Sequence, residues 1–61
     1  MQLKTKCFEV KKIGEDHWQE IPEKMFLENL LDFFNPVTPA ISKMLQGGEI
    51  ATLQEIYRIR I

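Results

Sequence analysis

A proline break near the middle of the chain constrains the fold more than any other feature. Residues 30–46 read LLDFFNPVTPAISKMLQ, which is an apolar run, a break at Asn35-Pro36 and a second run. Proline disfavours helical geometry in the residue before it, so a helix that reaches Phe34 has to stop at Asn35. Proline is tolerated in the first turn of a helix, so Pro39 lets a new helix begin at once. The sequence therefore predicts two helices joined by a tight corner.

The first helix is predicted over residues 22–34. Pro22 suits the first helical position, and Glu23 places negative charge where the helix dipole favours it. Apolar residues fall on one broad side of this helix and polar residues on the other, as in a helix that packs against a core. The apolar stripe consists of Phe26, Leu27, Leu30, Leu31, Phe33 and Phe34.

The second helix is predicted over residues 38–46. Thr38 is a favoured capping residue at a helix start, and Gly47-Gly48 is a favoured stop. Its apolar members share one side at helical spacing. They are Ile41, Met44 and Leu45.

The amino-terminal segment predicts a β-hairpin. Residues 3–13 are rich in residues that suit a pleated surface, and Gly14-Glu15-Asp16 has the composition of a turn. Residues 17–21 then supply the returning strand. Ile21 precedes a proline, which favours extended geometry at the end of that strand.

The carboxy-terminal residues 49–61 fit two structures. Apolar residues between positions 50 and 57 keep helical spacing, whereas the last five alternate with arginine as a strand does. We expect a strand over residues 56–61 that pairs with the amino-terminal strand. The predicted fold is α+β, with a three-stranded sheet covered by the helices, in a single small domain over residues 1–61.

Size and composition exclude several classes of protein. The chain has 61 residues with one cysteine and one histidine, so it can form neither an intrachain disulfide nor a metal site from those residues. No apolar run approaches the roughly 18 residues of a membrane span, and the amino terminus lacks the apolar core of a secretory signal. We therefore expect a cytoplasmic protein without a cofactor, a metal or a membrane partner.

Catalysis is not expected. A chain this small can scarcely enclose a substrate pocket of ~300 Å³. His17 beside Trp18 suits partial packing with a solvated imidazole, and Glu20 and Glu23 flank a proline at a helix start, where acids are favoured anyway. Cys7 sits among apolar strand residues, which indicates an inert thiol. The sequence predicts no catalytic residue.

The order of residues around the corner also has a counterpart among known proteins. A helix end at Phe34 is followed by Asn35, then by a helix that starts with threonine and carries an Ile-Ser pair, and later by LQG and TLQEIYRI. Over residues 30–59 this order resembles the helix-turn-helix of the phage-repressor and Cro-like DNA-binding families. The resemblance implies a DNA-facing side made of Thr38, Ala40, Ser42 and Lys43. The alternative is an ordinary helical corner without contact to DNA.

Four cations near the chain ends form a second candidate surface. If the terminal strands are neighbours, their alternation can place all four on one sheet face, where they can contact nucleic acid or an acidic protein. The alternative is a solvated face whose cations protect an exposed strand edge. The four residues are Lys4, Lys6, Arg58 and Arg60.

The apolar stripe of the first helix is large for one side of so small a domain. Burial against a second copy of the chain or against a larger protein would stabilise it. All six residues of the stripe are therefore candidates for an oligomer interface. Taken together, the sequence predicts a small non-enzymatic protein-interaction or regulatory module. The alternative is a small helix-turn-helix DNA-binding transcriptional regulator.

Overall fold

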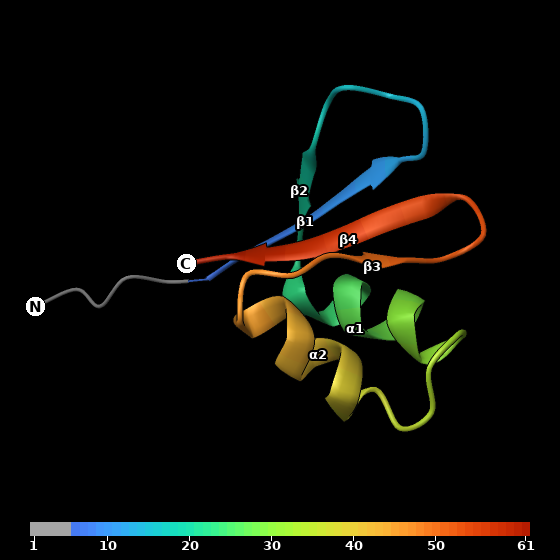
Figure 1. Ribbon diagram of the computed structural model, residues 1–61, viewed down its shortest axis with the longest axis vertical. Coiled ribbons are helices and arrows are strands. Elements are labelled where there is room, and N and C mark those ends of the chain that lie inside the picture. Colours follow the sequence, from blue (N-terminus) through green and yellow to red (C-terminus); the bar gives the residue numbers. More distant parts are fainter. Residues whose placement is uncertain (1–5) are drawn as a thin grey trace, which may run out of the picture.

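Two helices pack against one face of an antiparallel sheet in the computed structural model, which describes residues 6–61 (Figure 1). The strand order is β2-β1-β4-β3. The predicted α+β class and the pairing of the terminal strands are confirmed. In chain order the elements are β1 Cys7–Lys12, β2 Gln19–Ile21, α1 Glu23–Leu31, α2 Thr38–Leu45, β3 Ile50–Ala51 and β4 Glu55–Arg60.

The pair of strands β1 and β4 forms the centre of the sheet. It joins the two ends of the chain in antiparallel register, with Phe8 opposite Ile59 and Val10 opposite Tyr57. Successive side chains of a strand point to opposite faces, so these four residues share the face that the helices cover. Val10, Tyr57 and Ile59 are buried in the core and Phe8 packs against it.

The β1–β2 connection folds back at a glycine. Gly14 has a φ of +93°, which glycine adopts without the steric cost that a side chain brings. The N–H of Glu15 donates to the carbonyl of Lys12 over 3.0 Å and closes the turn. The returning strand is shorter than predicted, and its last residue, Ile21, is buried opposite Phe8.

Helix α1 is shorter than the predicted helix over residues 22–34. Pro22 is extended and precedes the helix, and its carbonyl accepts the N–H of Phe26 over 3.0 Å. The helix ends at Leu31, although the N–H of Phe34 still donates to the carbonyl of Leu30 over 2.8 Å. The chain thus leaves helical geometry ahead of Pro36, which has no N–H to continue the hydrogen-bond ladder.

Helix α2 begins without the predicted hydroxyl cap and ends as predicted. Thr38 is the first helical residue, and no side chain caps the amino terminus, so the capping role predicted for Thr38 was wrong. At the other end, the N–H of Gly47 donates to Met44 and that of Gly48 to Lys43, both over 3.0 Å. With Gly47 at a φ of +94°, these bonds form a Schellman motif, which satisfies the last carbonyls of the helix.

Strand β3 was not predicted, so the sheet has four strands rather than three. It forms a hairpin with β4, in which Ile50 lies opposite Tyr57. The N–H of Thr52 donates to the carbonyl of Glu55 over 2.7 Å, and the Thr52 hydroxyl accepts the N–H of Glu55 over 3.2 Å. The helical spacing of residues 50–57 was misleading because Leu53 lies at the turn and is 86% exposed.

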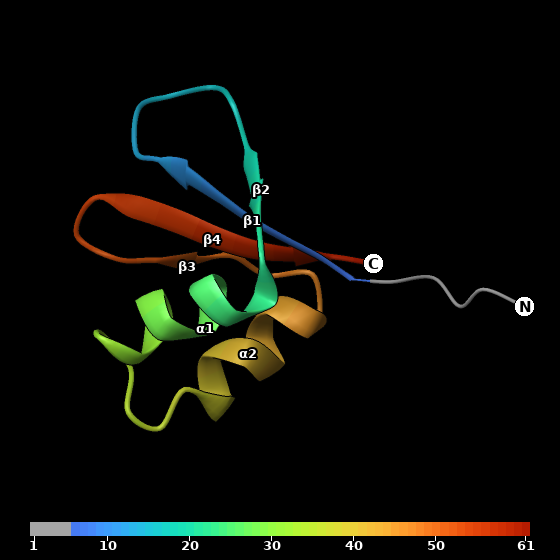
Figure 2. The same ribbon diagram turned by 180° about the vertical axis from the view of Figure 1, so that it is seen from behind.

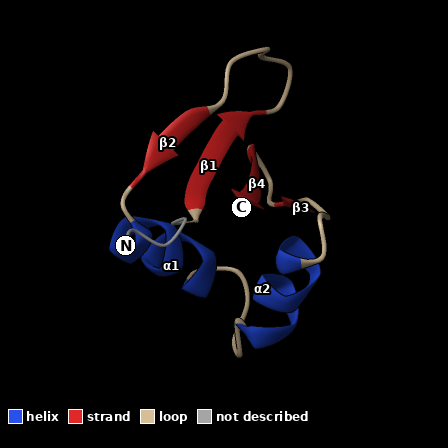
Figure 3. Ribbon diagram, turned by 90° about the vertical axis from the view of Figure 1, so that its left-hand side faces the viewer, coloured by secondary structure: helices blue, strands red, loops and turns tan. Residues whose placement is uncertain are grey.

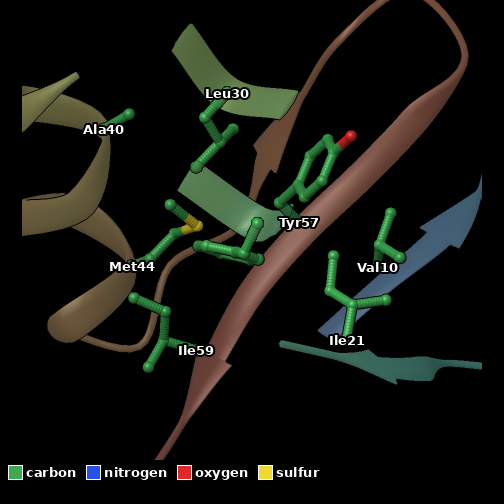
Figure 4. Packing of buried hydrophobic residues seen from close by; sticks show 8 residues of the cluster. Val10, Ile21, Leu30, Ala40, Met44, Tyr57 and Ile59 are labelled. Carbon is green, nitrogen blue, oxygen red and sulfur yellow. The ribbon is translucent and has the colours of Figure 1, made fainter. Parts of the chain in front are cut away.

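The helices divide one face of the sheet between them. Helix α1 lies under β1, and α2 lies under β4 and β3 (Figures 2 and 3). Leu30 from α1 and Met44 from α2 point into the space beside Tyr57 and Ile59 of β4 (Figure 4). The opposite face of the sheet carries no helix from residues 6–61.

Adjacent leucines of α1 allow a matched test of this packing. Leu30 is fully buried, whereas Leu31 is 51% exposed. We expect Leu30→Ala to lower the free energy of unfolding by about 2–5 kcal/mol, because it removes buried methyl groups and leaves a cavity. Leu31→Ala should cost less than about 1 kcal/mol. Urea denaturation followed by circular dichroism measures both, and equal losses would contradict this placement of α1.

Candidate functional site

The uncovered face of the sheet carries charged side chains around a single tryptophan. Glu9 and Lys11 come from β1, Arg58 and Arg60 come from β4, and Trp18 reaches across from the residue before β2. We refer to these five residues as the open-face cluster. Strand pairing brings them together, since Glu9 lies directly opposite Arg58.

Glu9 is a buried acid that holds both arginines. Only 8% of the residue is exposed. The Nε–H of Arg58 donates to its Oε1 over 2.7 Å, and Nη1 of Arg60 lies 3.6 Å from its Oε2. A carboxylate removed from water is stable only when it is paired and hydrogen-bonded. The two arginines supply that pairing, and Glu9 in turn fixes the Nε edge of Arg58.

Trp18 fixes the plane of the same guanidinium. The Cζ atom of Arg58 lies 3.9 Å from the centre of the indole ring, and Nζ of Lys11 lies 5.1 Å from it. Both distances are within the range in which a cation is attracted to an aromatic face. Within residues 6–61 the guanidinium makes its side-chain hydrogen bond through Nε. Its two Nη groups have no side-chain hydrogen-bond partner within these residues, and the side chain is 27% exposed.

The register adds polar and apolar neighbours on either side of the cluster. Glu20 of β2 lies opposite Glu9, so the β2 side of the face carries a further negative charge. On the other side, Ile56 lies opposite both Lys11 and Ala51, and alternation along β4 places it on the same face as Arg58. The face is thus acidic beyond β1 and apolar towards β3.

A second polar group lies on the covered side of the sheet. The hydroxyl of Tyr57 donates to Oε1 of Glu55 over 2.6 Å. Burial raises the pKa of Tyr57 to about 12, and the hydrogen bond to Glu55 and the negative charge of Glu55 act in the same direction. The side chain of Asn29 in α1 acts in the opposite direction. The hydrogen bond joins two residues of β4 on the side of the sheet that the helices cover.

The residues implied by the helix-turn-helix resemblance are not all at the surface. Thr38, Ser42 and Lys43 are exposed on α2. Ala40 is 6% exposed and belongs to the hydrophobic core, so it cannot contact DNA. The reason is that Ala40 and Met44, four residues apart, form the side of α2 that packs on the sheet.

The structure brings together two of the four predicted surface cations. Arg58 and Arg60 lie beside Glu9, whereas Lys6 precedes β1 and is exposed, and Lys4 lies outside the described residues. Glu9, Lys11 and Trp18 were not recognised as partners of these arginines. The sequence pattern that could have identified Glu9 is its position between the apolar residues Phe8 and Val10, because alternation along a strand then places Glu9 on the polar face of β1.

The apolar stripe is divided between core and surface. Phe26 and Leu30 are fully buried within the domain, so they are not available to a partner. Leu27 and Phe34 are partly buried, and Phe34 packs against the core. Leu31 and Phe33 are the two members that remain about half-exposed. The candidate oligomer interface is therefore much smaller than the six-residue stripe.

The remaining candidate residues differ in exposure. Cys7 is a partly buried free thiol, while His17, Glu20 and Glu23 are exposed. Among residues 6–61 no three histidine, cysteine, aspartate or glutamate side chains are grouped so that they could hold a metal ion. Neither helix of this part of the chain has the length and apolar character needed to cross a membrane.

Comparisons with models of protein families, with curated proteins and with solved structures find no match for the chain.

The environment of Tyr57 predicts a pH dependence of stability. Because its pKa is raised from 10.0 to about 12 in the folded protein, the neutral phenol is favoured by folding. This contribution, on the order of 2 kcal/mol, is complete below pH 10 and is lost as the pH rises through 12. Tyr57 is the only tyrosine, so tyrosinate absorbance reports it directly. If Tyr57 of the folded protein ionised with a midpoint near pH 10, the prediction would be contradicted. Tyr57→Phe should remove the loss of stability between pH 10 and 12.

Charge removal at Glu9 tests how the open-face cluster is held. Glu9→Gln keeps the shape of the side chain but removes the charge that faces two arginines. We expect the free energy of unfolding to fall by about 1–3 kcal/mol and the emission of Trp18 to change, because Arg58 loses a charge-assisted hydrogen bond. Glu15→Gln, at an exposed loop acid, is the matched control and should change neither quantity. Identical behaviour of the two variants would show that Glu9 does not hold Arg58.

Proposed function

We propose that the protein is a small non-enzymatic protein-interaction module and that the open-face cluster is its binding surface. The observation that supports this most directly is the stack of Arg58 on Trp18, 3.9 Å from guanidinium carbon to ring centre, on a sheet face that no helix of residues 6–61 covers. Tryptophan and arginine are the residue types that most often dominate the binding energy of protein interfaces.

The fixed geometry of the cluster strengthens the proposal. Long side chains lose rotamer freedom when a partner binds, and this loss weakens the complex. Arg58 is already held at its Nε edge by Glu9 and over its plane by Trp18. Its ordering therefore takes place on folding rather than on binding, which favours a specific complex.

Site-specific photo-crosslinking in cells of the source organism tests the binding surface. A benzophenone amino acid at Glu20, exposed at the rim of the cluster, should form an adduct with a protein partner. The same group at Ser42, exposed on α2, should not. Trp18→Leu, which keeps an apolar side chain, should abolish the Glu20 adduct, and the purified partner should then bind the unaltered protein but not this variant.

Two results would overturn the proposal. One is adduct formation from position 42 and none from position 20. The other is an undiminished adduct in both Trp18→Leu and Arg58→Gln, with native circular dichroism spectra. Because the two variants change different parts of the cluster, one that fails to fold leaves the other to decide.

DNA binding is the alternative function, and three exposed residues of α2 favour it. Thr38, Ser42 and Lys43 are accessible to a DNA groove. Phosphate contacts make such binding weaken steeply with salt. Salt-dependent binding of duplex DNA that is lost in Lys43→Ala would favour the regulator over the interaction module.

Self-association is a further candidate function, with Leu31 and Phe33 as the exposed apolar residues that a second copy of the chain would cover.

A further inference from the structure

We propose that the open-face cluster receives a carboxylate from an extended acidic segment of a partner protein, and that Arg58 is the residue that binds it. The proposal rests on the protein-interaction function above and names the chemistry of the partner. It is carried by the Nη edge of the guanidinium, which has no side-chain hydrogen-bond partner within residues 6–61, by the local charge, and by the apolar neighbours Ile56 and Ala51.

The geometry of Arg58 defines the group that it can bind. Glu9 occupies the Nε edge at 2.7 Å, and Trp18 lies over the plane at 3.9 Å from Cζ. The two Nη groups at the far end form a planar fork with parallel N–H donors. A carboxylate has the matching pair of oxygens at the matching spacing, so it can accept both bonds at once.

The charge of the cluster favours an acid although the chain as a whole does not. Lys11, Arg58 and Arg60 contribute three positive charges and Glu9 one negative charge, which leaves the cluster at +2. The whole chain has a formal net charge of −1. Glu20 lies on the β2 side. An incoming carboxylate is therefore directed to the β4 side, where Arg58 and Arg60 lie.

The neighbours of Arg58 specify what flanks the acid. Ile56 lies two residues from Arg58 on the same face of β4, with Ala51 of β3 opposite it. Two residues of extended chain advance about 7 Å, in the partner as in β4. A partner strand that runs antiparallel to β4 and places a carboxylate on Arg58 therefore places its next same-side residue over Ile56 and Ala51. The sequence expected in the partner is an acid, any residue, and then an aliphatic residue.

A single-stranded nucleic acid fits this face less well. Binding of unpaired bases depends on aromatic rings with a free surface for stacking. Trp18 is the aromatic residue of the cluster, and two cations of the protein itself already lie over its ring. Phe26 contacts both Phe8 and Tyr57 on the other side of the sheet. The observations therefore favour a peptide.

The fluorescence of Trp18 provides the test, because it is the only tryptophan. The probes are a short peptide that repeats Glu-Thr-Ile, its matched version with glutamine in place of glutamate, inorganic phosphate, and an oligothymidine. The acidic peptide should change Trp18 emission saturably, and the glutamine peptide should bind at least about tenfold more weakly because it lacks the charge. Binding of the acidic peptide should weaken as salt is added.

Variants connect this binding to Arg58. Arg58→Lys keeps the charge but loses the planar fork, so affinity for the acidic peptide should fall about tenfold. Lys24→Gln removes one positive charge from an exposed position of α1 and should leave this affinity unchanged. If Arg58→Lys does not fold, the Nη–H resonances of Arg58 in the unaltered protein decide the question, since the acidic peptide alone should shift them.

The contrary outcomes show whether the carboxylate proposal fails alone or together with the proposed protein-interaction function. Equal binding of the glutamine peptide, or no response to the acidic peptide at millimolar concentration, would overturn the carboxylate, while the adduct from position 20 would still decide whether the face binds a protein. A stronger response to phosphate would replace the carboxylate with a phosphate group. A stronger response to oligothymidine would overturn both the carboxylate and the protein-interaction function.

Discussion

The pairing of β1 with β4 is the contact on which the rest of the structure depends. It closes nearly the whole chain into one loop, because Cys7 pairs with Arg60. Such long-range closure is unfavourable in entropy, and a short chain without a disulfide has to offset it with burial. The offset comes from Tyr57 and Ile59, whose side chains are buried between the sheet and the helices in the same core as Met44. Without this pairing, α2 has no sheet to pack on.

The same pairing creates the open-face cluster, because alternation along two strands separates apolar from charged residues. Odd-numbered residues of β1 meet even-numbered residues of β4 on the open face. One register therefore aligns both the core and the open-face cluster. A slip by one residue would move Glu9 into the core and Val10 into water, so the buried apolar residues also specify the position of Arg58.

Local signals in the sequence predicted the helices better than the sheet. Prolines and Gly47-Gly48 act within a few residues, and their effects on α1 and α2 were predicted to within a few positions. Strand β3 has only two residues and no glycine-containing turn, so no local sequence pattern predicts it. Trp18 contacts Arg58, which is forty residues away in the sequence. This contact depends on the register of β1 and β4, and no local sequence pattern predicts that register.

Glu9 is the residue whose presence stability alone does not explain. A buried ion pair usually contributes little beyond what a well-packed apolar side chain would give, because removing the charges from water is costly. Its position opposite Glu20 adds like-charge repulsion across β1 and β2. An aliphatic residue at position 9 would avoid both costs but would leave Arg58 free to rotate. The buried acid is therefore best understood as the group that keeps one guanidinium fixed on the open face of the sheet.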